Sequence, residues 1–188
     1  MSRIQSIVSR PKRTLAALAT VLVAVGITAA SGADFTAQSA NASNTFTAGS
    51  LTMDNSEGAG AILSATGMKP GDATTNAVGT VVIKNTGTLA GTFTLGKSAL
   101  TDTPSSPAMS GKLNVTVIDC GTGVAATCAV GDPDVYTGTL AAMGTGIDLG
   151  SFAGGEEHLY EFTVALDSSA DNTYQNGSSL ATFLWQAA

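Results

Sequence analysis

The feature that most constrains the fold is an alternation of apolar and polar side chains over residues 160–166. Tyr160, Phe162, Val164 and Leu166 stand at every second position, with mostly polar residues between them. Successive side chains of a strand point to opposite faces, so this period of two is typical of a strand with one buried face. Hardly any stretch beyond residue 33 holds a helical period instead. The pattern predicts an all-β protein.

Further short strands are expected at residues 78–83, 93–95, 113–117 and 180–187, separated by turn residues. One such turn is 69–72, Lys-Pro-Gly-Asp, which has the Pro-Gly centre of a type II turn. The last run carries large apolar side chains on both faces, so we expect it to be well covered. Several strands at this spacing predict an antiparallel jelly roll or β-sandwich over residues 45–188.

The first 33 residues differ sharply from the rest. Four basic residues precede an uncharged apolar run, residues 15–30, and the small residues Ser31, Gly32 and Ala33 follow it. This order predicts a signal peptide, residues 1–33, that forms a helix and is cut by a signal peptidase between Ala33 and Asp34, with a cut after Ala30 as the alternative. An uncleaved anchor is disfavoured, because 16 apolar residues fall short of the roughly 20 that span a bilayer.

Cleavage predicts a secreted protein of the extracellular matrix or cell surface, which contacts the membrane only through the signal segment before the cut. Residues 34–188 contain four lysines, no arginine and fourteen acidic residues, a formal charge of −10. A chain so poor in cations has little with which to bind phosphate, so nucleic acid is excluded as a partner.

Cys120 and Cys128 are the only cysteines, and they flank a glycine-rich stretch. In an exported chain this pair predicts a disulfide. A metal site is the weaker alternative, because no second cysteine pair or nearby histidine completes one.

Residues 34–44 follow the predicted cleavage site and do not read as part of a self-contained sandwich. They are small and polar except for Phe35, and uncharged except for Asp34. One interpretation is a disordered terminus. The other is an assembly arm that completes the sheet of a neighbouring molecule. Its leading residues are Asp34, Phe35, Thr36, Ala37, Gln38 and Ser39.

Several segments together resemble the TasA and camelysin family of secreted bacterial biofilm-matrix and cell-surface proteins, which use a dedicated signal peptidase. The segments are the signal peptide and residues 44–51 (NTFTAGSL), 82–89 (VIKNTGTL), 149–150, 155–156, 160–166, 172–177 (NTYQNG) and 183–185. Each is weak alone, and their order and spacing carry the resemblance. The chain departs from the best-known matrix member in its shorter length and its cysteine pair.

The resemblance implies a jelly roll whose matrix members form fibres, the N-terminal segment of one subunit pairing as a strand with the next. Strand addition satisfies an exposed sheet edge with backbone hydrogen bonds and suits a small-residue arm. The expected partners are further copies of the chain and other matrix or cell-wall proteins. A non-polymerising cell-surface binding module remains an alternative.

The same family includes a protein described as a metallo-endopeptidase, so a catalytic alternative stays open. No HExxH motif or nucleophile elbow is present, and His158 is the only histidine. Glu156 and Glu157 adjoin it, but adjacent strand residues point to opposite faces, and we expect a solvent-facing start to the strand. The acidic segments 132–134 and 167–171 lack the spacing of a calcium loop. The sequence therefore predicts no catalytic residue, metal or cofactor.

Overall fold

The computed structural model describes residues 47–123 and 126–188. The predicted signal peptide, its cleavage site and the arm at 34–44 lie outside these residues. The described chain forms eight strands and three single-turn 3₁₀ helices, and no helix within it is long and apolar enough to cross a membrane. The strands are β1 (Met53–Asn55), β2 (Ala77–Asn85), β3 (Gly91–Thr103), β4 (Leu113–Thr122), β5 (Asp134–Thr139), β6 (Ile147–Phe152), β7 (Glu157–Leu166) and β8 (Ser178–Ala187). The 3₁₀ helices are η1 (Ala73–Thr75), η2 (Met109–Gly111) and η3 (Asn172–Tyr174).

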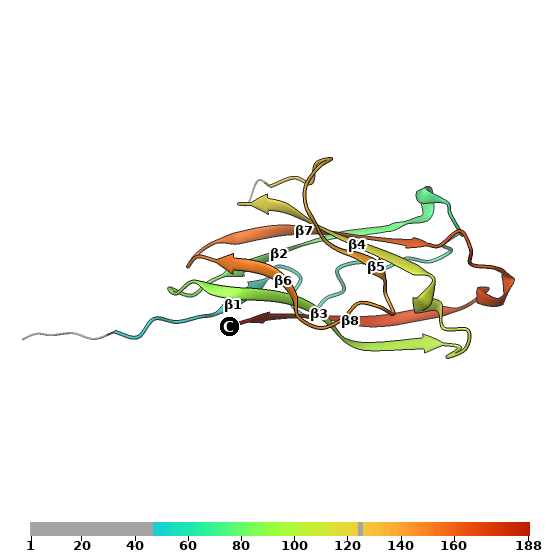
Figure 1. Ribbon diagram of the computed structural model, residues 1–188, viewed down its shortest axis with the longest axis horizontal. Helices are drawn as coiled ribbons and strands as arrows, with labels where there is room; N and C mark the ends of the chain where they lie inside the picture. The colour runs from blue at the N-terminus through green and yellow to red at the C-terminus, as the bar shows by residue number, and fades with distance from the viewer. Residues whose placement is uncertain (1–46, 124–125) are drawn as a thin grey trace, which may run out of the picture. The chain divides into compact units, whose positions relative to one another are not determined.

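Two antiparallel sheets make up the described domain (Figure 1). One has the strand order β1-β2-β7-β4-β5 and the other the order β6-β3-β8. Every pairing is antiparallel, and the longest runs between β3 and β8. The prediction of an all-β, sandwich-like protein is confirmed.

The core lies between the sheets and follows the alternation in the sequence. Tyr160, Phe162, Val164 and Leu166 of β7 are all buried, as the period of two predicts. Aromatic rings from both sheets meet there: Trp185 of β8 lies 5.3 Å from Tyr160 between ring centroids. Burying a large apolar side chain contributes about 1.5 to 3 kcal/mol, so these strands supply much of the cohesion between the layers.

Polar side chains fix two connections. Asn85 is fully buried, where its amide donates to the carbonyl oxygens of Leu89 (2.8 Å) and Phe152 (3.0 Å) and accepts from the Gly87 N–H (2.9 Å). Asp102 accepts hydrogen bonds from the hydroxyls of Ser110 and Ser179 and so joins β3, η2 and β8. A buried polar group is tolerated when its hydrogen bonds are made, and Asn85 meets that condition.

The predicted turn at 69–72 is present. The Asp72 N–H donates to the Lys69 carbonyl oxygen (3.2 Å), and Gly71 has a φ of 69°. A type II turn needs positive φ at its third residue, which glycine adopts without strain. This turn leads the chain from the region of β1 into β2.

The expectation that residues 180–187 are covered on both faces is wrong. Phe183 and Trp185 face the core, but Leu180 is 75 % exposed and Leu184 is 40 % exposed. The reason is that Leu180 and Leu184 point to the outer face of the smaller sheet, which no element of the described chain covers. An apolar pattern on both faces cannot by itself distinguish a central strand from such an edge.

Candidate functional site: an open sheet edge

The two sheets end in four edge strands, and one of them differs from the rest. β1, β5 and β6 are three, six and six residues long, and each carries an aspartate: Asp54, Asp134 and Asp148. Short strands with charged residues resist pairing with other chains. β8 is ten residues long and contains no charged residue. It is therefore the edge least protected against strand addition.

Hydrogen bonds at the end of β8 reveal which of its backbone groups are free. Ala188 and Thr92 exchange both backbone hydrogen bonds, and the Thr182 carbonyl oxygen accepts from the Ser98 hydroxyl at 3.4 Å. Backbone direction alternates along a strand, so even-numbered residues point toward β3. The odd-numbered residues point to the open edge, where no part of the described chain pairs with them. They are Ser179, Ala181, Phe183, Trp185 and Ala187.

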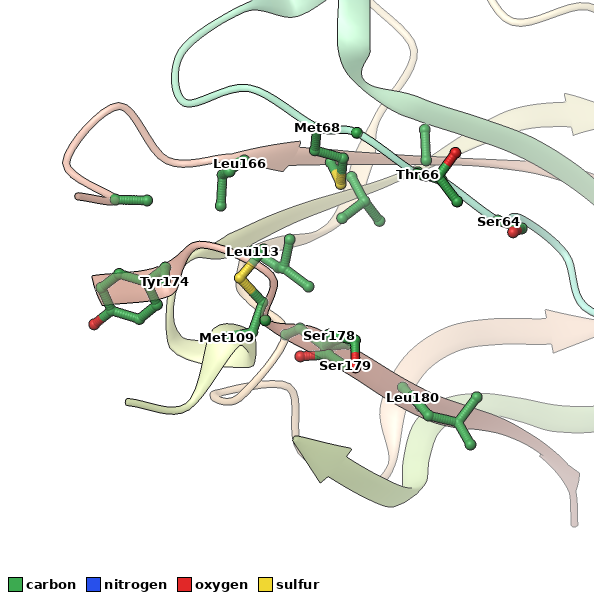
Figure 2. Close-up of a pocket in the computed structure, with 18 of the residues that line it drawn as sticks. Ser64, Thr66, Met68, Met109, Leu113, Leu166, Tyr174, Ser178, Ser179 and Leu180 are labelled. Carbon is green, nitrogen blue, oxygen red and sulfur yellow. The ribbon is translucent and has the colours of Figure 1, made fainter. Parts of the chain in front are cut away.

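An apolar groove of about 860 Å³ runs beside this edge. Residues 61–68 form one side and β8 the other, with Leu113 and Leu166 between them (Figure 2). Both leucines belong to the buried core. The groove therefore opens the space between the two sheets along the unpaired side of β8, and it is long, apolar and lined by few charges.

The described chain begins near one end of this groove. The Ser50 N–H donates to the Thr88 hydroxyl oxygen (3.0 Å). Leu51 packs so closely on Gly91 that a Cβ there would lie 2.6 Å from a leucine methyl and 3.1 Å from the Ala188 carbonyl oxygen. Leu51 therefore lies at the end of the domain where β8 finishes.

Cys120 and Cys128 form a disulfide, with their Cα atoms 4.4 Å apart. It joins the end of β4 to the loop that precedes β5, and Cys120 is buried. The described residues contain no free cysteine. The disulfide thus stabilises the connection between β4 and β5 in the five-stranded sheet.

His158 is not the solvent-facing residue that we expected. Its side chain is 15 % exposed, and its ring stacks on Phe152 with centroids 4.3 Å apart. Nδ1 lies 2.9 and 3.1 Å from the two carboxylate oxygens of Asp119, and Nε2 lies 3.3 Å from Glu156. The expectation failed because His158 stands two positions before Tyr160, so both side chains point to the inner face of the sheet. The alternation in the sequence already indicated this direction. Asp119 had no signal in the sequence.

This histidine cluster joins the strands β4 and β7 through side-chain hydrogen bonds. Both ring nitrogens face carboxylates, so neither is free to ligate a metal or to accept a proton from a substrate. The pKa of Glu156 is lowered, chiefly by the hydrogen bond from the Ala153 N–H and, against burial, by His158. Burial raises the pKa of Tyr160. Glu157 lies on the opposite face, 3.1 Å from Lys84. No three acidic, histidine or cysteine side chains in the described chain are placed to hold a metal.

The acidic segments at 132–134 and 167–171 bond to their own turns. Asp132 accepts from the Ala129 N–H at 2.7 Å, and Asp171 accepts from the Thr173 N–H at 2.9 Å. Asp167 accepts hydrogen bonds from Ser169 and Asn114, which lower its pKa to about 2. These carboxylates cap turns at the surface.

In comparisons with known proteins, the chain matches no family model and no curated protein. The open edge of β8 and the groove beside it are the features of the described chain that bear most directly on function.

Proposed function

We propose that the protein is a secreted structural subunit, of the kind found in the TasA and camelysin family, that forms fibres in a biofilm matrix or on the cell surface. In this proposal the arm at 34–44 of one copy adds as a strand to β8 of the next. The observation that carries it is β8 itself, a ten-residue edge without charge beside an apolar groove. Natural proteins rarely leave such an edge exposed unless a partner covers it.

The strand order leaves room for one more strand in the smaller sheet, which has three strands against the five of the larger one. In an eight-stranded jelly roll the first strand lies beside the last. Here β1 pairs with β2, and it spans only three residues. The side of β8 that faces the groove is therefore the place that we propose for the added strand.

The arm suits this place in length and chemistry. It has eleven residues against the ten of β8, and it is uncharged beyond Asp34. An arm that turned back from Thr47 onto its own β8 would run parallel to that strand, because the chain enters where β8 ends. A second copy has no such restriction and can pair antiparallel, which is the slightly more stable arrangement and the one that β3 already makes. We therefore assign the arm to a neighbouring copy.

The alternatives have weaker support. A camelysin-like peptidase needs a metal ligand or general base, and the single histidine has both nitrogens directed at carboxylates. A binding module that does not polymerise leaves the uncharged edge of β8 without a role. The predicted export and cleavage step fits the fibre proposal, because strand exchange requires the arm to have a free end.

Electron microscopy tests the proposal directly. A chain that begins at Asp34 should form fibres, whereas a chain that begins at Thr45 should remain monomeric. The second chain keeps both sheets and every described core residue, all of which lie beyond position 46. Fibres from both chains, or from neither under any condition, would contradict strand exchange.

A matched control keeps the length of the arm. The double variant Ala37→Pro, Ala40→Pro retains eleven residues but loses one N–H donor on each side of the strand, so one of the two faces β8 in either register. It should behave as the deleted chain does. Fibre formation at the parent concentration would show that the arm acts through something other than backbone pairing.

A further inference from the structure

The side of the groove opposite β8 is formed by residues 61–68, the flanking segment, and its backbone is unusual. The segment contains no proline and no charged residue. Within the described chain, none of its backbone N–H or C=O groups makes a hydrogen bond. Residues 63–66 (LSAT) are compatible with a strand, whereas Gly67 has a φ of 68°, which a strand does not adopt. The segment follows β1 and precedes β2 along the chain and pairs with neither. Its backbone groups therefore have no partner within the described chain, beside the same groove.

The flanking segment is held in place at both ends. Ser56 and Val82 share two hydrogen bonds, Ser56 N–H to the Val82 carbonyl oxygen (3.0 Å) and Val82 N–H to the Ser56 hydroxyl (2.9 Å). After the segment, the Lys69 N–H donates to the Thr75 hydroxyl oxygen at 2.9 Å. Between these anchors, Ile62 crosses over Gly79, where a Cβ would lie 2.1 Å from the Ile62 carbonyl oxygen.

Side chains of the flanking segment reach the same groove from the other direction. Leu63 and Met68 are half-buried and pack against the core. Thr66 and Met68 lie across the groove from Ser178 and Leu180 (Figure 2). The segment runs from the end of β1 toward the turn at 69–72, opposite in direction to β8.

From these observations we infer that the groove accepts a strand by pairing with it on both sides: with the odd-numbered residues of β8 on one side and with the flanking segment on the other. The inference rests on the proposed function, since the strand is the arm of a second copy. An arm antiparallel to β8 runs parallel to the flanking segment. Its insertion gives the eight-residue segment the hydrogen bonds that it lacks in the free subunit and closes the sandwich along this side.

Amide hydrogen exchange measured by NMR separates one-sided from two-sided pairing. The sample is the chain that begins at Thr45, with and without a peptide of residues 34–44. In the free chain the amides of 61–68 should exchange at nearly unprotected rates, because none has a partner. With saturating peptide, alternate amides of 61–68 should slow at least tenfold, together with those of Ala181, Phe183 and Trp185.

The outcomes distinguish the two proposals. Slowing in β8 alone overturns two-sided pairing and leaves strand addition intact. Slowing in neither segment contradicts strand addition as well. Slowing in the flanking segment and β8 together supports both.

A pair of proline variants tests the pairing of the flanking segment independently of amide exchange. Neighbouring N–H groups of a strand point to opposite sides, so Ala65→Pro and Thr66→Pro should not act alike. One should weaken peptide binding roughly 2- to 13-fold, the effect of one lost hydrogen bond, and the other should leave it nearly unchanged. Equal effects of the two variants, or no effect of either, would overturn the role of the flanking segment. Neither should lower the melting temperature of the free chain by more than a few degrees.

Discussion

Replacing Ala181 by proline isolates the free edge of β8 from the rest of the fold. Ala181 is odd-numbered, so its N–H points away from β3 and has no partner in the described chain. Proline is tolerated on an edge strand when the lost N–H faces solvent. Ala181→Pro should therefore leave the free energy of unfolding of the monomer within about 1 kcal/mol of the parent value.

The same substitution should impair assembly. An added strand loses one hydrogen bond, about 0.5 to 1.5 kcal/mol, which weakens each subunit contact roughly 2- to 13-fold. The proline ring also occupies the space in which the strand would lie, so this range is a lower limit. Sedimentation of fibres at graded protein concentrations measures the effect as a rise in the critical concentration.

Thr182→Pro is the matched control one position along the strand. The backbone of Thr182 points toward β3, so this proline removes a hydrogen bond within the sheet. Urea unfolding should show a loss of about 1 to 3 kcal/mol in the monomer. Our reasoning about the edge fails if Ala181→Pro unfolds the monomer as readily as Thr182→Pro, or if it leaves the critical concentration unchanged.

Three further substitutions test the fold by urea unfolding. Asn85→Ala removes three hydrogen bonds from a fully buried side chain and should cost about 3 kcal/mol. Burial raises the pKa of Asp102, but hydrogen bonds from two serines outweigh it and lower the pKa overall. The ionised carboxylate therefore adds to the free energy of unfolding above about pH 4, and this contribution is lost as the pH falls further. Asp102→Asn should make the free energy of unfolding fall less steeply in acid. Replacing Cys120 and Cys128 by serine should cost roughly 2 to 3 kcal/mol, as expected for so short a loop.

Local patterns predicted much of the fold. Alternation in 160–166 placed β7 and its buried face, and the Pro-Gly pair placed the turn at 69–72. Both depend on residues close in sequence, whose geometry is fixed by strand periodicity and by the φ that glycine allows. The order of strands in the sheets depends instead on long-range packing, which no short pattern reports.

The open edge of β8 could not be predicted either, because it too depends on which distant strands pair with one another. Residues 180–187 carry apolar side chains on both faces, and such a run is expected at the centre of a sheet. The strand order leaves β8 at an edge, and Leu180 is exposed because the outer face of the smaller sheet is uncovered in the described chain. The prediction for His158 failed for a different reason, because the alternation of the strand already indicated that its side chain points inward. Its partner Asp119 could not be predicted, since it lies 39 positions away and becomes a neighbour only through the pairing of β4 with β7.

Strand exchange in this geometry makes the two ends of a fibre different. In the proposed exchange a subunit donates its arm from the side of Leu51, which lies near the end of β8, and accepts a strand in the groove along β8, so the donating and accepting surfaces are separate. Such a contact is heterologous and builds an open filament when its rotation does not close a ring. One end of the fibre then presents a free groove and the other presents a free arm.

Two reagents should therefore stop growth at opposite ends. A chain that begins at Thr45 accepts the free arm but offers none in return, and a peptide of residues 34–44 fills the free groove. Labelled fibre seeds that are treated with one reagent, separated from its excess and then extended with a second colour should grow from one end, and seeds treated with both reagents should grow from neither. If treatment with one reagent alone blocked growth at both ends, the contact would be symmetric. Both ends would then present the same surface, which both donates and accepts a strand and therefore binds the same reagent.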